Sequence, residues 1–94
     1  MFIGTNKIKY ISRQDALDEL SKLDLCDVEI RDQEEKIFLA IEKFEDDESE
    51  HIDFCLVIEI PISLSLNKSY TICASDNYEE ILEKYNKIKG EELC

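Results

Sequence analysis

Glycine and proline are scarce in this chain, with two glycines and one proline among 94 residues. Walker phosphate loops, dinucleotide-binding fingerprints and the nucleophile elbow of serine hydrolases each need two glycines a few residues apart, and none of these motifs occurs. Because no other stretch marks a catalytic site, we do not expect an enzyme. The scarcity of both residues also favours regular elements joined by short polar turns.

Histidine and cysteine offer little catalytic chemistry. His51 is the single histidine, and Cys55 would lie about 13 Å from it along a strand, too far to form a catalytic pair. The four cysteines are widely spaced and include no C-x-x-C pair. We therefore expect free thiols in a reducing cytosol rather than disulfides.

Long apolar runs are also missing, and none approaches the length of about 18 residues that a membrane span needs. The first ten residues, MFIGTNKIKY, lack the basic start and the apolar region of a signal peptide. We expect a soluble protein of the cytoplasm. With 44% hydrophobic and 36% charged residues, the composition is typical of one globular domain over residues 1–94.

Basic residues are strongly outnumbered. Eleven lysines and arginines stand against 23 aspartates and glutamates, which gives a net charge of −12. Most of the excess lies between Asp24 and Glu59, where 14 acids accompany three bases. Such a charge disfavours direct binding to nucleic acid or to anionic membranes, so a partner recognised by charge should be basic.

Alternation of apolar and polar residues predicts strands at 2–11, 26–31, 36–44, 52–66 and 70–74. In the first strand, Ile8 and Tyr10 lie on one face and Lys7 and Lys9 on the other. As one straight strand, 52–66 would extend about 50 Å, which is too long for so small a domain. Pro61 cannot donate to a ladder and is the expected break.

Two helices are predicted. The first begins at Ser12, a good N-cap, with Asp15 three residues on. The second has Ser75 or Asp76 as N-cap, lysines near its end and Gly90 just beyond it. The stripes expected to be buried are Ala16, Leu17, Leu20 and Leu23, and Tyr78, Ile81, Leu82, Tyr85 and Ile88.

The order β-α-β-β-β-β-α predicts an α+β fold, an antiparallel four- to five-stranded sheet with both helices packed on one face. On the other face, we place Phe38 near Val57, Ala40 near Cys55 and Glu42 near Asp53, and a one-residue slip would send these side chains to the core. The expected apolar strip is Phe38, Ala40, Phe44, Cys55 and Val57, and its acidic rim is Asp27, Glu29, Glu42, Asp53 and Glu59.

The run FEDDESEHIDF, from Phe44 to Phe54, has five acids among the six residues 45–50. A calcium loop would need a glycine and alternating ligands, so we expect no metal and no cofactor. Charged loops are usually solvated, but here the acids adjoin the apolar strip, as in protein interfaces. The expected partner-binding residues are Asp27, Glu29, Phe38, Glu42, Asp46, Asp47, Glu48, Glu50 and Asp53.

Three functional hypotheses follow. The first is an inhibitor that binds the basic surface where a nuclease or another nucleic-acid enzyme holds phosphates; the second is an immunity protein that neutralises a basic nuclease toxin. The third is a homodimeric interaction module. In size, charge and lack of motifs the chain resembles small acidic phage proteins, including anti-CRISPR proteins, that block nucleases as nucleic-acid mimics. No sequence motif supports assignment to a family.

Overall fold

The computed structural model describes residues 1–23, 37–61 and 67–93. The elements in these ranges are β1 (Phe2–Ile11), α1 (Arg13–Ser21), β2 (Ile37–Glu45), β3 (Ile52–Pro61), β4 (Asn67–Ser75), α2 (Tyr78–Lys87) and β5 (Glu91–Glu92). The strands form one antiparallel sheet, which confirms the predicted α+β class and sheet type. The strand predicted at 26–31, with Asp27 and Glu29, lies outside the described residues.

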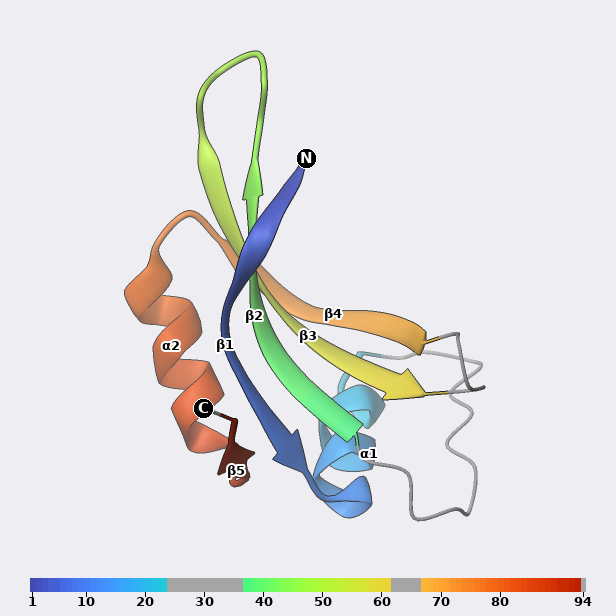
Figure 1. Ribbon diagram of the computed structural model, residues 1–94. Coiled ribbons are helices and arrows are strands. Elements are labelled where there is room, and N and C mark those ends of the chain that lie inside the picture. The colour runs from blue at the N-terminus through green and yellow to red at the C-terminus, as the bar shows by residue number, and fades with distance from the viewer. Residues whose placement is uncertain (24–36, 62–66, 94) are drawn as a thin grey trace.

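The sheet has the strand order β4-β3-β2-β1-β5. The β2–β3 hairpin projects beyond the rest of the molecule, and the N-terminus lies beside it (Figure 1). The described part of β3 extends to Pro61, and residues 62–66 of the predicted strand lie outside the described residues. The short strand β5, which the sequence does not predict, pairs with Lys9 and Tyr10 of β1.

The register of the hairpin differs by two residues from the prediction. Phe38 pairs with Glu59 rather than Val57, and the closing pair is Glu45 with Ile52. A shift of two residues leaves every side chain on its predicted face, because strand side chains alternate with period two. β2 extends into the acidic run as far as Glu45, whose backbone exchanges hydrogen bonds of 2.7 and 2.8 Å with Met1.

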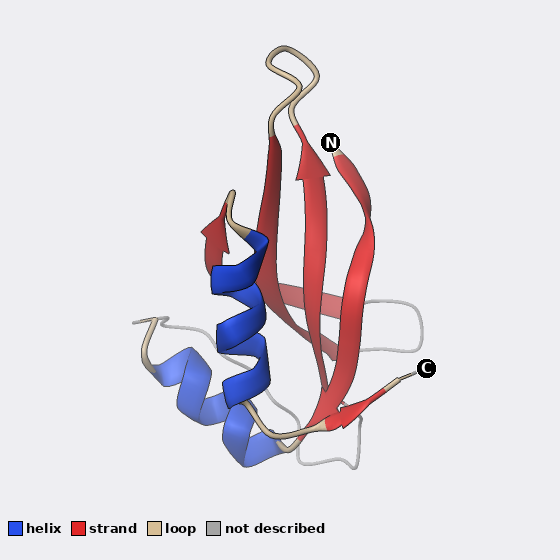
Figure 2. Cartoon of the chain, turned by 90° about the vertical axis from the view of Figure 1, so that its left-hand side faces the viewer, coloured by secondary structure: helices blue, strands red, loops and turns tan. Residues whose placement is uncertain are grey.

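The core combines side chains of the sheet with side chains of both helices. Leu39 and Ile41 of β2 pair with Ile58 and Leu56 of β3, and all four are buried. Ala16 and Leu20 from α1 and Ile81 and Tyr85 from α2 belong to the same cluster of buried side chains. Figure 2 shows α2 running beside the long strands, in roughly the same direction. The prediction that both helices pack on one face goes beyond these observations and stays a prediction.

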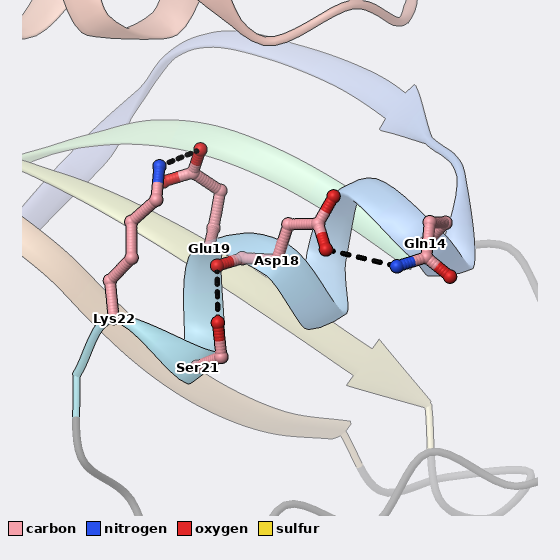
Figure 3. A network of polar contacts seen from close by, with 5 residues as sticks. All are labelled: Gln14, Asp18, Glu19, Ser21 and Lys22. Carbon is pink, nitrogen blue, oxygen red and sulfur yellow. Dashed lines mark hydrogen bonds and ion pairs between the residues drawn. The ribbon is translucent and has the colours of Figure 1, made fainter.

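α1 begins as predicted, with Ser12 Oγ accepting a hydrogen bond of 3.1 Å from the backbone N–H of Asp15. Polar groups on the exposed side of α1 form hydrogen bonds and an ion pair with one another (Figure 3). Gln14 Nε2 donates to Asp18 Oδ1 at 2.9 Å, and Lys22 Nζ lies 3.2 Å from Glu19 Oε1. Asp18 and Glu19 are therefore engaged by side chains of their own helix and its C-cap.

The ends of α2 differ from the prediction. Asn77 is the N-cap, because its side-chain oxygen accepts a hydrogen bond from the N–H of Glu79 at 3.0 Å. Ser75 Oγ in turn accepts a hydrogen bond from the N–H of Asn77. The helix ends at Lys87, since Ile88 is already extended. Gly90 therefore does not cap the helix. It is required for close approach, because a Cβ there would stand 2.4 Å from the backbone oxygen of Tyr10.

Candidate partner-binding face

Two small apolar residues are buried on the side of the sheet away from the core. Ala40 and Val57 are 2% and 3% exposed and pair with each other, yet neither belongs to the core cluster. Residues directly opposite in a sheet share a face. We define the outer face as the side that carries Ile8, Tyr10, Phe38, Ala40, Glu42, Phe44, Asp53, Cys55, Val57 and Glu59.

Aromatic rings extend this face beyond the predicted strip. Tyr10 pairs with Phe38 across β1 and β2, and their ring centroids are 4.8 Å apart. Phe2 and Phe44 make a second contact nearer the hairpin, with centroids 5.6 Å apart. Aromatic pairs of this geometry add packing energy to an apolar surface. The outer face is therefore wider than the sequence predicts.

The inward orientation of the Lys9 side chain explains why β1 presents Ile8 and Tyr10 on the outer face. This side chain points to the core side, where it donates hydrogen bonds to the backbone oxygens of Tyr85, at 2.6 Å, and of Ile88. These carbonyls lie at the C-terminal end of α2, where the helix dipole favours a cation. With Lys9 inward, the alternation of the strand sends Ile8 and Tyr10 outward. Burial lowers the pKa of the Lys9 ammonium, and the nearby Glu92 opposes this shift.

Two carboxyl groups meet on the outer face. Glu42 pairs with Cys55 and Glu59 with Phe38, so they stand on either side of Ala40 and Val57. Burial raises the pKa of Glu42, and a hydrogen bond to the Glu59 carboxyl and the charge of Glu59 raise it further. The predicted neighbour of Glu42, Asp53, pairs instead with Phe44.

Cys55 lies beside these carboxyls without the chemistry of a nucleophile. Burial raises the pKa of its thiol, and the charges of Asp53 and Glu42 raise it further. The thiolate is the reactive form of cysteine, and this environment disfavours it. Cys55 and Cys73 are both free thiols, as the sequence predicts.

The acidic loop, residues 46–51, forms an ordered turn. Asp46 accepts a hydrogen bond of 3.0 Å from the N–H of Glu48 on its side chain, and another of 3.0 Å from Glu50 on its backbone oxygen. The first of these contacts, followed by one from Ser49, lowers the pKa of the Asp46 carboxyl. Asp46 is thus a structural residue of the loop, whereas the side chains of Asp47, Glu48 and Glu50 are exposed.

His51 connects this loop to the turn before α2. Its Nε2 lies 3.0 Å from Asp53 Oδ1 and 3.9 Å from Asp76 Oδ2. His51 thus lies between the start of β3 and a segment distant in sequence. Within the ranges that the structure describes, no group of three or more His, Cys, Asp or Glu side chains is arranged to hold a metal ion.

The predicted binding residues in the described part of the chain are spread along the hairpin. Glu42, Asp53 and the acidic loop lie toward the loop end, whereas Phe38 lies on the outer face at the opposite end of β2, paired with Glu59. Met1, Phe44, Glu45, Asp46, Asp47, Glu48 and Asp53 line a common hollow of about 410 Å³. Sequence reasoning placed Ile8 and Tyr10 on one face of the first strand but missed them as members of the outer face, because alternation does not say which side of the strand points inward.

No family model, curated protein or solved structure matches this chain. Within residues 1–23, 37–61 and 67–93, neither helix is long and apolar enough to cross a membrane.

Proposed function

We propose that the protein is a cytoplasmic inhibitor that binds the basic surface on which an enzyme, such as a nuclease, holds nucleic acid. The observation that carries this proposal is that the outer face and the acidic loop form one continuous surface. Phe44 of the outer face lines the same hollow as Asp46, Asp47 and Glu48 of the acidic loop. An apolar strip bordered by charge of one sign is typical of a protein interface.

Both parts of this surface have a role in the proposed complex. Phosphates along duplex DNA present one charge per ~1.7 Å of axis, so a surface that binds them carries a strong positive field. The carboxylates of the projecting hairpin compete for that field and speed association. The aromatic pairs supply contacts that salt does not screen. We infer that both helices cover the opposite face, which leaves the outer face for the partner.

Two alternatives remain from the sequence. An immunity protein for a nuclease toxin would use the same surface in the same way, and a toxin gene beside its own would distinguish it. The homodimeric module is less favoured by the charges. A contact between two outer faces would bring Glu42, Asp53 and Glu59 of both copies together, and like charges across an interface are costly.

The test begins with capture of the partner from a host lysate. The protein serves as bait, a salt gradient elutes bound proteins, and mass spectrometry identifies them. The proposal expects a nucleic-acid enzyme that short duplex DNA displaces from the bait. A dimer that captures no such enzyme would contradict it.

Charge reversal then tests the acidic loop. Asp47→Lys, Glu48→Lys and Glu50→Lys spare Asp46, and together they are expected to lower the association rate with the captured enzyme about tenfold or more at low salt. The matched control reverses the exposed residues Asp18, Glu83 and Glu91 and changes net charge equally. An equal loss in both variants would mean that total charge alone matters, and no loss in either would refute the electrostatic proposal.

A further inference from the structure

β1 is only partly covered by its neighbour β5. The short strand pairs with Lys9 and Tyr10, and the N–H of Leu93 donates to the Ile8 oxygen at 3.0 Å. Residues 2–7 of β1 therefore have no strand on the side away from β2 among the described residues. Figure 2 shows β5 beside one end of β1 only. We call this side of residues 2–7 the open edge, and such an edge is a template for the addition of another strand.

Exposed apolar side chains gather along the open edge. In the described part of the chain, the large hydrophobic residues exposed to solvent are Met1, Phe2, Ile3 and Leu93. The first three lie at the start of β1. Leu93 lines a hollow of about 410 Å³ together with residues 5–8, so the hollow lies beside β1 just beyond the end of β5, where a further strand would run. Exposed apolar groups that gather in one place mark an interaction site.

The charges along the open edge allow a second copy of the chain to approach. Residues 1–14 contain no acid, although the net charge is −12. Lys7 Nζ lies 3.6 Å from Glu92 Oε1, so its charge is balanced within its own chain. Contact between two open edges thus avoids the clash of carboxylates that two outer faces would bring. β4, at the other end of the sheet, also lacks acids, but its exposed residues are polar apart from Ala74.

We propose that two copies of the chain pair through their open edges, antiparallel and related by a twofold axis. Each contact then occurs twice, as in every twofold interface. With the axis near Thr5, Ile3 of one copy stands opposite Lys7 of the other, beside the hollow and Leu93. The exposed apolar residues of the two copies thereby cover each other. Because an added strand lies in the plane of the sheet, both outer faces stay open, and the inference does not rest on the proposed function.

Interruptions in β1 make this a weak dimer. The register against β2 shifts between Phe2 and Gly4 and between Thr5 and Lys7, and such bulges limit pairing along an edge. We expect a Kd of about 100 µM, typical of a small interface. Sedimentation equilibrium up to about 1 mM should show the mass rising from 11.0 kDa toward twice this value.

Salt should tighten the dimer, because it screens the repulsion between two chains of net charge −12. Binding to a basic enzyme should instead weaken with salt, so the two associations are distinguishable. A protein that stays monomeric up to about 1 mM, well above the expected Kd, would overturn the proposal. Dissociation of the dimer as salt rises would also overturn it, because that result requires attraction between opposite charges.

Matched variants locate the interface. Ile3→Glu places an acid on the open edge of both copies and should weaken the dimer about tenfold or more. Thr71→Glu adds the same charge at an exposed position of β4 and should change the Kd less than about threefold. Equal losses would mean that net charge alone governs association, and a loss confined to Thr71→Glu would assign the dimer to β4. Either result would refute pairing through the open edge.

Amide signals locate the interface without a variant. On dilution of the ¹⁵N-labelled protein, the signals of residues 2–8 and of Leu93 should shift, whereas those of residues 67–75 in β4 should not. Shifts confined to the acidic loop or to β4 would contradict the proposal. If the protein is monomeric and the captured enzyme shifts residues 2–8, the open edge binds that enzyme, and pairing between copies is overturned.

Discussion

The ammonium nitrogen of Lys9 lies 4.1 Å from the centre of the Tyr85 ring and donates a 2.6 Å hydrogen bond to the backbone oxygen of the same tyrosine. One side chain of β1 thus contacts both the ring and the backbone at the end of α2. A cation over an aromatic face and at a helix C-terminus is stabilised twice. The contact explains how a lysine that is 5% exposed is tolerated on the core side of the sheet.

Replacement of Lys9 by methionine should destabilise the protein by about 2 kcal/mol. The variant keeps most of the side-chain volume but removes the ammonium donor from the carbonyls of Tyr85 and Ile88, of which that of Tyr85 still accepts from the N–H of Ile88 at 3.3 Å. Thermal or urea unfolding gives the free energy. Lys7→Met is the control, because Lys7 pairs with exposed Glu92 at 3.6 Å and such pairs contribute little. A Lys9→Met protein as stable as the Lys7→Met protein would contradict the assigned role.

Tyr85→Phe should leave stability unchanged or raise it by up to about 1 kcal/mol at neutral pH. The Tyr85 hydroxyl is buried and has no hydrogen-bond partner among the described residues, and an unsatisfied buried group costs free energy. A clear loss of stability in this variant would show that the hydroxyl has a partner. The hollow of about 410 Å³ that Tyr85 lines with Lys7 and Glu92 is where that partner would bind.

We also expect the stability difference between Tyr85→Phe and the wild-type protein to depend on pH in the alkaline range. Burial, and then the charge of Glu92, raises the pKa of Tyr85 to about 12. Because the folded protein holds this proton more tightly than the unfolded chain, wild-type stability falls as pH rises from about 10 through 12. Phenylalanine does not titrate, so the advantage of Tyr85→Phe should grow over this range. A constant difference between pH 8 and 12 would contradict the raised pKa.

Glu42→Gln should raise stability at pH 7 by an amount that disappears in acid. The folded-state pKa of Glu42 lies above its ordinary value, so its contribution is present below the unfolded pKa and is lost as pH rises through the folded one. Glutamine stays neutral and donates to Glu59 at every pH. Melting temperatures of both proteins from pH 3 to 8 test this, with exposed Glu83→Gln as the control. A pH-independent difference would disprove the prediction.

Gly90→Ala should destabilise the protein by about 1 to 3 kcal/mol, because its Cβ would stand 2.4 Å from the backbone oxygen of Tyr10. The strain should act first on β5. Amide exchange of Leu93, whose N–H donates to the Ile8 oxygen at 3.0 Å, should therefore accelerate more than that of residues in β3. Lys89→Ala, at the preceding exposed position, is the control. Unchanged exchange at Leu93 would show that the backbone accommodates the methyl group.

The sequence was sufficient for features that depend on local pattern. Alternation predicted the strands and, for β2 and β3, the correct face for each side chain, since a register error of two residues preserves the period. Ser12 predicted the start of α1. The cluster of acids beside Phe44 was also evident, because both lie in one continuous stretch of chain.

Only the tertiary structure decided which side of β1 faces the core, how β2 aligns with β3, and why Gly90 is a glycine. Alternation separates Lys9 from Tyr10 but does not say which points inward. That choice depends on the carbonyls at the end of α2, more than 70 residues away in sequence. The alignment of β2 with β3 is also a contact between strands, which local alternation does not specify. The carboxyl pair of Glu42 and Glu59 forms only once that register is set, because it is a contact between strands and has no local signal.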